Sequence, residues 1–110
     1  MRNSISVFNL PVKAAADIKE FTFVGISGAN PAAGGYALGI AAANCGAGDM
    51  AAVDVLGTAS MLAGGVIAVG SEIEVGAGGK GVAKTTGKTV ARALEAASAD
   101  DVIEVLLVQS

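Results

Sequence analysis

The sequence contains no histidine, no tryptophan, one cysteine and few aromatic residues. Without histidine, the chain lacks the usual general base near neutral pH and the commonest metal ligand. The single cysteine, Cys45, excludes an internal disulfide and a zinc site built from several thiolates. A nucleophilic cysteine needs a neighbouring base, so we expect Cys45 to be a small apolar residue that is at least half-buried. The composition therefore predicts a protein that is not an enzyme and holds no cofactor and no metal.

Strong positive charge is also missing, since the net charge is −3. A chain without a basic patch is poorly suited to binding nucleic-acid phosphates, so we expect no nucleic-acid partner. Residues 21–48 carry no charge, but they contain many Ala and Gly residues and few large aliphatic ones. Such a segment gains too little free energy on transfer to lipid to predict a membrane span. The N-terminal residues lack the apolar stretch of a signal peptide.

Ala and Gly make up more than a third of the 110 residues. This length is sufficient for one domain. Small side chains bury little apolar area, and glycine raises the entropy cost of folding. A monomer of this composition should be only marginally stable, which favours an oligomer or a larger assembly.

Short apolar runs alternate with glycine-rich turns, a pattern typical of an all-β barrel or sandwich of short strands. The β-branched residues of 102–109 form the clearest predicted strand. Residues 88–98 are ambiguous between strand and helix, because Ala, Arg, Leu and Glu also favour a helix, so one short helix is compatible with the pattern. Residues 37–56 resemble residues 91–107, since each segment has an Ala-rich strand, an acidic turn and a valine-rich strand.

The N-terminal segment differs from the rest of the chain. Its residues SISVFNLPV predict an extended arm or an edge strand, because proline cannot donate a hydrogen bond to a β-ladder. We therefore divide the chain into an N-terminal arm, residues 1–20, and a single β-rich domain, residues 21–110. We expect apolar residues of the arm to contact a partner, with an edge strand of the domain's own sheet as the alternative. These predicted contact residues are Val7, Phe8, Leu10, Pro11 and Val12.

The segment GKGVAKTTGKT, residues 79–89, superficially resembles a phosphate-binding loop. Such a loop has four residues between its glycines, whereas five separate Gly81 from Gly87, and Val82 lies where conformational freedom is needed. Too little chain follows for the later strand that would bind the metal. We interpret Lys80, Lys84 and Lys88 as solvated charges. Glu72 and Glu74 alternate with apolar residues in EIEV, which predicts that both carboxylates face solvent.

Several segments together resemble the capsid cement, or head decoration, proteins of tailed bacteriophages. The matching segments, in order, are GYALGIAAANCGAGD, VDVLG, IAVGSEIEV, GKGVAKT and ARALEAASADDVIEVLLV, and the resemblance covers roughly residues 21–108. Each segment is of low complexity, so the order and spacing carry the resemblance.

The resemblance implies a compact β-rich, non-enzymatic structural protein that forms a homotrimer. It would be made in the host cytoplasm and would lie on the outer surface of the virion capsid, where it would bridge neighbouring major capsid proteins. It implies no small-molecule substrate and no membrane partner. The alternatives are another virion β-module, such as a tail or fibre adaptor, and, from a distant class, a nucleotide-binding enzyme fragment with a degenerate phosphate loop.

Overall fold

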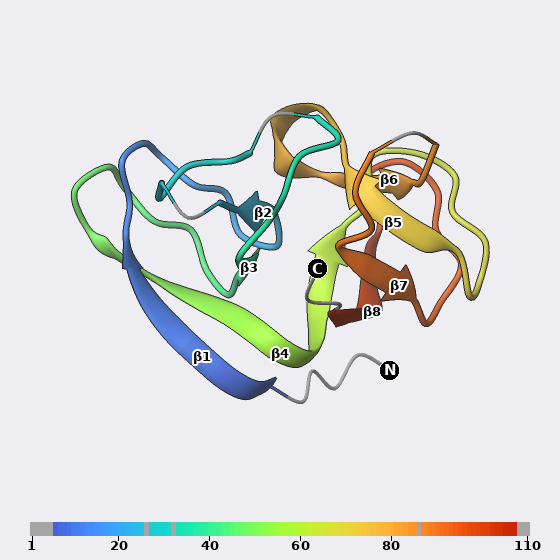
Figure 1. Cartoon of the computed structure of the whole chain (residues 1–110), viewed down its shortest axis with the longest axis horizontal. Helices are drawn as coiled ribbons and strands as arrows, with labels where there is room; N and C mark the ends of the chain where they lie inside the picture. The colour runs from blue at the N-terminus through green and yellow to red at the C-terminus, as the bar shows by residue number, and fades with distance from the viewer. Residues whose placement is uncertain (1–5, 26, 32, 86, 108–110) are drawn as a thin grey trace.

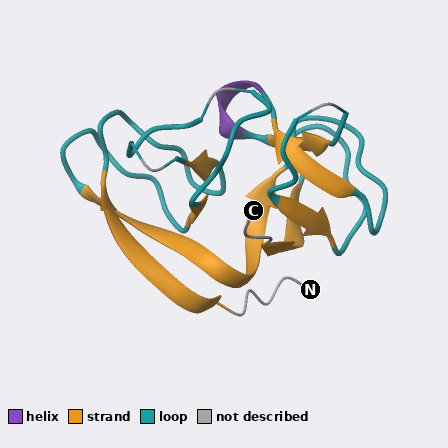
Figure 2. Cartoon of the chain, viewed as in Figure 1, coloured by secondary structure: helices purple, strands orange, loops and turns teal. Residues whose placement is uncertain are grey.

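The computed structural model describes residues 6–25, 27–31, 33–85 and 87–107, without the side chains of residues 6–10 and 56. Its elements are eight strands and one short 3-10 turn, connected by long loops (Figures 1 and 2). In chain order they are β1 (Ser6–Lys13), β2 (Phe23–Val24), β3 (Gly39–Ala41), β4 (Met50–Leu62), β5 (Glu72–Val75), η1 (Ala77–Gly79), β6 (Gly81–Ala83), β7 (Ala91–Ala93) and β8 (Val102–Leu107). The all-β prediction is confirmed.

The strands pair antiparallel in the order β2-β3-β4-β8-β7-β5-β6, and β1 pairs with β4 outside this path. The long strand β4 belongs to two sheets. Its residues 50–57 pair with β1 and β3, whereas Thr58–Leu62 pair with β8. The pairing changes at Gly57, whose φ of 90° is one that other residues rarely adopt, and β4 turns sharply in Figure 1.

The two halves of the chain on either side of Gly57 repeat one arrangement of strands. The first half uses β1, β2, β3 and the beginning of β4; the second uses the end of β4, then β5, β7 and β8. In each half the first strand pairs with the fourth, the second with the third, and the third with the fourth. The domain is therefore an internal structural duplication in which one strand serves both halves.

The segment after the second strand of each half also repeats. Gly28 N–H donates to Gly25 C=O at 3.0 Å, and Gly79 N–H donates to Gly76 C=O at 3.3 Å. Both donor residues have a left-handed backbone, with φ of 87° and 81°. The equivalence of the halves thus extends beyond the strands into a glycine turn.

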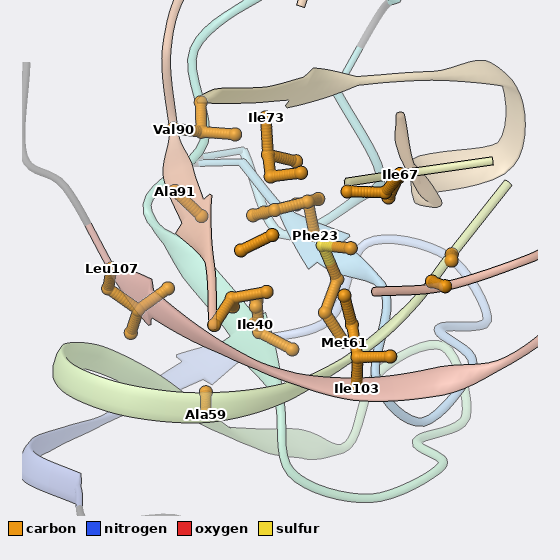
Figure 3. Close-up of a cluster of buried hydrophobic side chains, with 14 of the residues drawn as sticks. Phe23, Ile40, Ala59, Met61, Ile67, Ile73, Val90, Ala91, Ile103 and Leu107 are labelled. Carbon is orange, nitrogen blue, oxygen red and sulfur yellow. The ribbon is translucent and has the colours of Figure 1, made fainter. Parts of the chain in front are cut away.

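Each half has its own apolar core. Among the described side chains, the first-half core contains seven buried residues: Ala14, Ile18, Val24, Ala41, Ala51, Val53 and Val55. The second-half core is larger and centres on Met61, Ile73 and Val105. Phe23 and Ile40 come from first-half strands but lie in the second-half core, where Figure 3 shows them among its side chains. These two residues pack the halves against each other.

The structure also bears on two predictions that the sequence left open, the barrel or sandwich form and the state of residues 88–98. The described strands do not close into a barrel, so the barrel alternative is not confirmed. Within residues 88–98, β7 is a strand, and the chain then continues as a loop. The one helical element among the described residues, η1, is a three-residue turn in a glycine-rich segment. No helix in the described ranges has the length and apolar character needed to cross a membrane.

Candidate functional site

All five predicted contact residues lie on β1, but the structure describes only part of them. The side chain of Pro11 is exposed, and Val12 is half-buried and packs against the first-half core. The side chains of Val7, Phe8 and Leu10 fall outside the described part of the chain. The structure therefore brings Pro11 to the surface and turns Val12 partly inward.

Strand β1 has an irregular, one-sided pairing. Among the described strands it pairs with β4 alone, and its register shifts on both sides of Phe8. Pro11 has no N–H and so cannot donate to a further strand. Irregular register and proline are typical of an edge strand, where they limit uncontrolled pairing with other chains.

Four nine-residue loops with a common backbone scheme connect strands of the duplicated halves. We call them L1 (residues 14–22), L2 (41–49), L3 (63–71) and L4 (93–101). Each begins with a buried alanine: Ala14, Ala41, Ala63 and Ala93. L1 pairs with L2 and L3 pairs with L4 through reciprocal backbone bridges, which join Ile18 to Cys45 and Ile67 to Ala97.

The alanine of each loop is bound by the end of its partner loop. In the second half, Gly70 N–H donates to Ala93 C=O at 2.8 Å, and Ala93 N–H donates to Ser71 C=O at 2.9 Å. The end of L4 binds the alanine of L3 in the same way: Asp100 N–H donates to Ala63 C=O, and Ala63 N–H donates to Asp101 C=O, both at 2.8 Å. L1 and L2 make the same four bonds. Each loop pair is therefore related by a local two-fold symmetry.

Every loop ends in a tight turn whose third residue is left-handed. The backbone φ at this position is 66° at Phe21, 89° at Gly48, 83° at Gly70 and 67° at Asp100. In each turn, the N–H of the residue after the left-handed one donates to the C=O of the residue three positions earlier, at 3.1 to 3.3 Å. Positive φ favours glycine, which is present in only two of the loops.

The two loop pairs differ in the hydrogen bonds between their fourth and seventh positions. In the first half, Asp17 Oδ1 accepts from Ala47 N–H at 3.0 Å, and Asn44 Oδ1 accepts from Glu20 N–H at 2.8 Å. Both bonds run from the fourth position of one loop to the seventh of the other. The second half has Val66 and Ala96 at the fourth position, and neither side chain can accept a hydrogen bond.

The sequence revealed only half of this repeat. The resemblance between residues 37–56 and 91–107 corresponds to L2 and L4 with the strands around them. L1 and L3 escaped notice because the four loops share little beyond the initial Ala, an apolar residue or Cys four positions later, and a Thr, Ser or Asp at the ninth position. Those features are too common in an Ala- and Gly-rich chain to stand out.

The segment that resembles a phosphate loop is bound by a carboxylate of the chain itself. Glu74 Oε1 accepts from Thr85 N–H at 2.6 Å and from Gly87 N–H at 3.0 Å. The prediction that Glu74 faces solvent is wrong, because its side chain is buried. A Cβ on Gly87 would approach Gly34 Cα to 2.5 Å, so glycine serves close backbone packing here. Two N–H groups of this segment, those of Thr85 and Gly87, therefore already have a carboxylate acceptor.

The other charged residues of this region form surface pairs. Lys80 Nζ lies 2.9 Å from Asp100 Oδ1, and Lys88 Nζ lies 4.9 Å from the centre of the Tyr36 ring. Glu72 is exposed, as predicted. A hydrogen bond from the hydroxyl of Thr89, followed by the charge of Lys84, lowers the pKa of Glu72 below its ordinary value. Exposed pairs of this kind contribute little to stability.

Cys45 and the acidic side chains are the other groups of the chain with chemistry of their own. Cys45 is half-buried and packs against the first-half core, as expected for a small apolar residue. Within the ranges that the structure describes, no three acidic, cysteine or histidine side chains gather closely enough to hold a metal ion.

The family model for phage cement proteins matches residues 2–109, and the chain belongs to this family. It is a structural protein of the phage virion, associated with the capsid. Its fold is similar to the head fibre gp8.5 N base of bacteriophage phi29, with a TM-score of 0.76 and 18% identity over 94% of this chain and 95% of that one. No curated protein gives a significant match.

Proposed function

We propose that this chain is a capsid cement protein that binds the outer surface of the assembled icosahedral head. It bridges neighbouring major capsid proteins, acts as a homotrimer and carries out no catalysis. The observation that supports this proposal most strongly is the family match over nearly the whole chain.

The mechanism requires only preferential binding. A protein that binds the assembled shell, but not its free subunits, stabilises the shell by mass action. At a free concentration of about 100 times Kd, each occupied site contributes roughly 2.7 kcal/mol. Repeated over many sites, this contribution would oppose the internal pressure of the packaged genome.

Strand β1 is the first proposed contact with a neighbouring subunit or with the shell. It is an edge strand, and Pro11 is exposed on it. We assign Val7, Phe8, Leu10, Pro11 and Val12 to this contact. Substitution of Pro11 by Asp, with Ala16→Asp as a control on exposed L1, tests the assignment without removing a strand of the fold. Equal shell occupancy for both variants would contradict it.

The proposal as a whole is tested with empty, expanded capsids of the phage that encodes the chain, purified without this protein. We expect saturable co-sedimentation, a fixed number of copies per shell and a higher temperature of shell disruption. A trimeric mass in solution should accompany binding. Absence of binding to expanded capsids, with the protein folded, would exclude a cement role.

A second candidate is a module that attaches a fibre to the particle. Its support is the similarity in fold to the phi29 head fibre N base. A particle reconstruction separates the two: cement function predicts density across the shell lattice, whereas an adaptor predicts density confined to fibre or tail positions. A nucleotide-binding role has no comparable support, since Glu74 already accepts from the N–H groups of Thr85 and Gly87 in that loop. Saturable ATP binding that is lost on Lys88→Ala would revive it.

A further inference from the structure

The L3–L4 pair exposes apolar side chains where the equivalent L1–L2 pair carries polar ones. Val66 is 81% exposed and Val69 is 66% exposed, at the fourth and seventh positions of L3. The same positions of L1 hold Asp17 and Glu20, both exposed. One backbone scheme therefore supports a solvated surface in the first half and an apolar surface in the second.

Leu94 on L4 extends this apolar surface. It is 45% exposed, and it follows Ala93, whose carbonyl oxygen accepts from Gly70 N–H next to Val69. The equivalent residue of L2 is Ala42. We call Val66, Val69 and Leu94 the L3–L4 patch.

The fold does not require valine at these positions. In L1 and L2, the polar residues at the fourth position, Asp17 and Asn44, bind N–H groups of the partner loop. With Val66 and Ala96 in their place, the second half lacks both bonds. Exposed aliphatic side chains that replace available hydrogen bonds weaken the isolated domain, and such losses are typical of residues retained for function.

We propose that the L3–L4 patch docks into an apolar recess of the assembled shell, formed by the major capsid protein. This inference rests on the proposed cement function and assigns it a surface. Three aliphatic side chains cover far less than the ~800 Å² that each partner contributes to a stable interface. The patch is therefore too small to hold two copies of this chain together, but it suits a shell contact that is repeated by each subunit of a bound oligomer.

The test variant transplants the L1 residues into L3 as Val66→Asp together with Val69→Glu. Because L1 tolerates these residues on the same backbone, we expect an unchanged fold and oligomeric mass. Binding to expanded empty capsids of the same phage should fall at least tenfold. Should the double variant misfold, Val69→Ser alone supplies the same test, with an expected loss of a few fold.

A charge-matched control separates loss of the patch from added negative charge. Ala42→Asp together with Ala43→Glu places two acidic residues on the exposed part of L2, and we expect its shell binding to match wild type. If the L3 variant binds as well as this control, the inference fails while cement function stands. If the L3 variant loses its oligomeric mass, the patch is instead a contact between copies. If wild type itself does not bind, the proposed function fails first.

Discussion

Removal of the Glu74 carboxylate tests whether Thr85 and Gly87 belong to an internally bound loop rather than to a ligand site. Glu74 is buried, and its Oε1 accepts from Thr85 N–H and Gly87 N–H at 2.6 and 3.0 Å. Hydrogen bonds to a charged partner contribute roughly 1.5–3 kcal/mol each. Thr85 is exposed and Gly87 is half-buried, so water can replace part of each bond, and we take the lower end of that range. Glu74→Ala should therefore cost about 3 kcal/mol.

This loss corresponds to a clear shift in melting temperature. With an unfolding entropy of roughly 2.1 cal/mol/K per residue, a chain of this size shifts by ~4 °C for each kcal/mol. Glu74→Ala should lower Tm by about 12 °C, and Glu74→Gln, which keeps a neutral acceptor, by about half as much. Calorimetry on both variants measures the effect. The control is Glu72→Gln, since Glu72 is exposed and should change Tm by less than ~4 °C. A Tm for Glu74→Ala within ~3 °C of wild type would refute the reasoning.

Three further predictions concern single positions. Gly70→Ala should lower the free energy of unfolding by about 1 kcal/mol, because the backbone φ of 83° strains any residue with a Cβ even though the surrounding space is open. Gly65→Ala, which is also in open space, should be neutral or slightly stabilising. Chemical denaturation measures both effects. Glu104→Leu should raise Tm by ~4–8 °C, since both buried carboxylate oxygens lack a partner among the described residues; a lower Tm would contradict this. By NMR, the pKa of Glu72 should lie below 4.5 and should rise in Thr89→Val. Because the pKa of Glu72 is lower in the folded state, its carboxylate stabilises the fold at pH values above the unfolded-state pKa. This contribution to stability is lost as the pH falls through the folded-state pKa.

The sequence predicted the strands that have large β-branched side chains and turn residues at their ends. Residues 102–109, the clearest predicted strand, contain β8. Phe21 shows where a local pattern misleads, because Phe21 and Phe23 alternate around polar Thr22 as they would in a strand. The strand β2 begins only at Phe23, and Phe21 has a left-handed backbone with φ of 66°. Pairing of L1 with L2 imposes that conformation, and a local pattern cannot report it.

Of the two candidate surfaces, the sequence pointed to the one on β1 and missed the L3–L4 patch. That Pro11 belongs to an extended arm or an edge strand was predicted from the sequence, because the loss of an N–H is a property of the residue itself. The L3–L4 patch was not, because valines in an Ala- and Gly-rich segment look like core residues. Only the pairing of Ile67 with Ala97, which turns Ile67 inward, leaves Val66 and Val69 outside. Those contacts join residues far apart in the chain through backbone atoms. Since every residue has the same backbone, the amino-acid sequence gives no local sign of them.

The duplication explains how a chain with few large side chains forms one domain. Among the side chains that the structure describes, the first-half core is small and has no residue larger than isoleucine. Strand β4 crosses from one half to the other, and Phe23 and Ile40 leave the first half to fill the second-half core. Neither half can therefore bury its apolar surface alone, so the halves should unfold together. Because stability depends on the shared strand and the two cores, the outer positions of L3 and L4 are left free to differ from those of L1 and L2. A duplicated fold with one polar and one apolar loop pair can thus present a binding surface on one half while the other remains solvated.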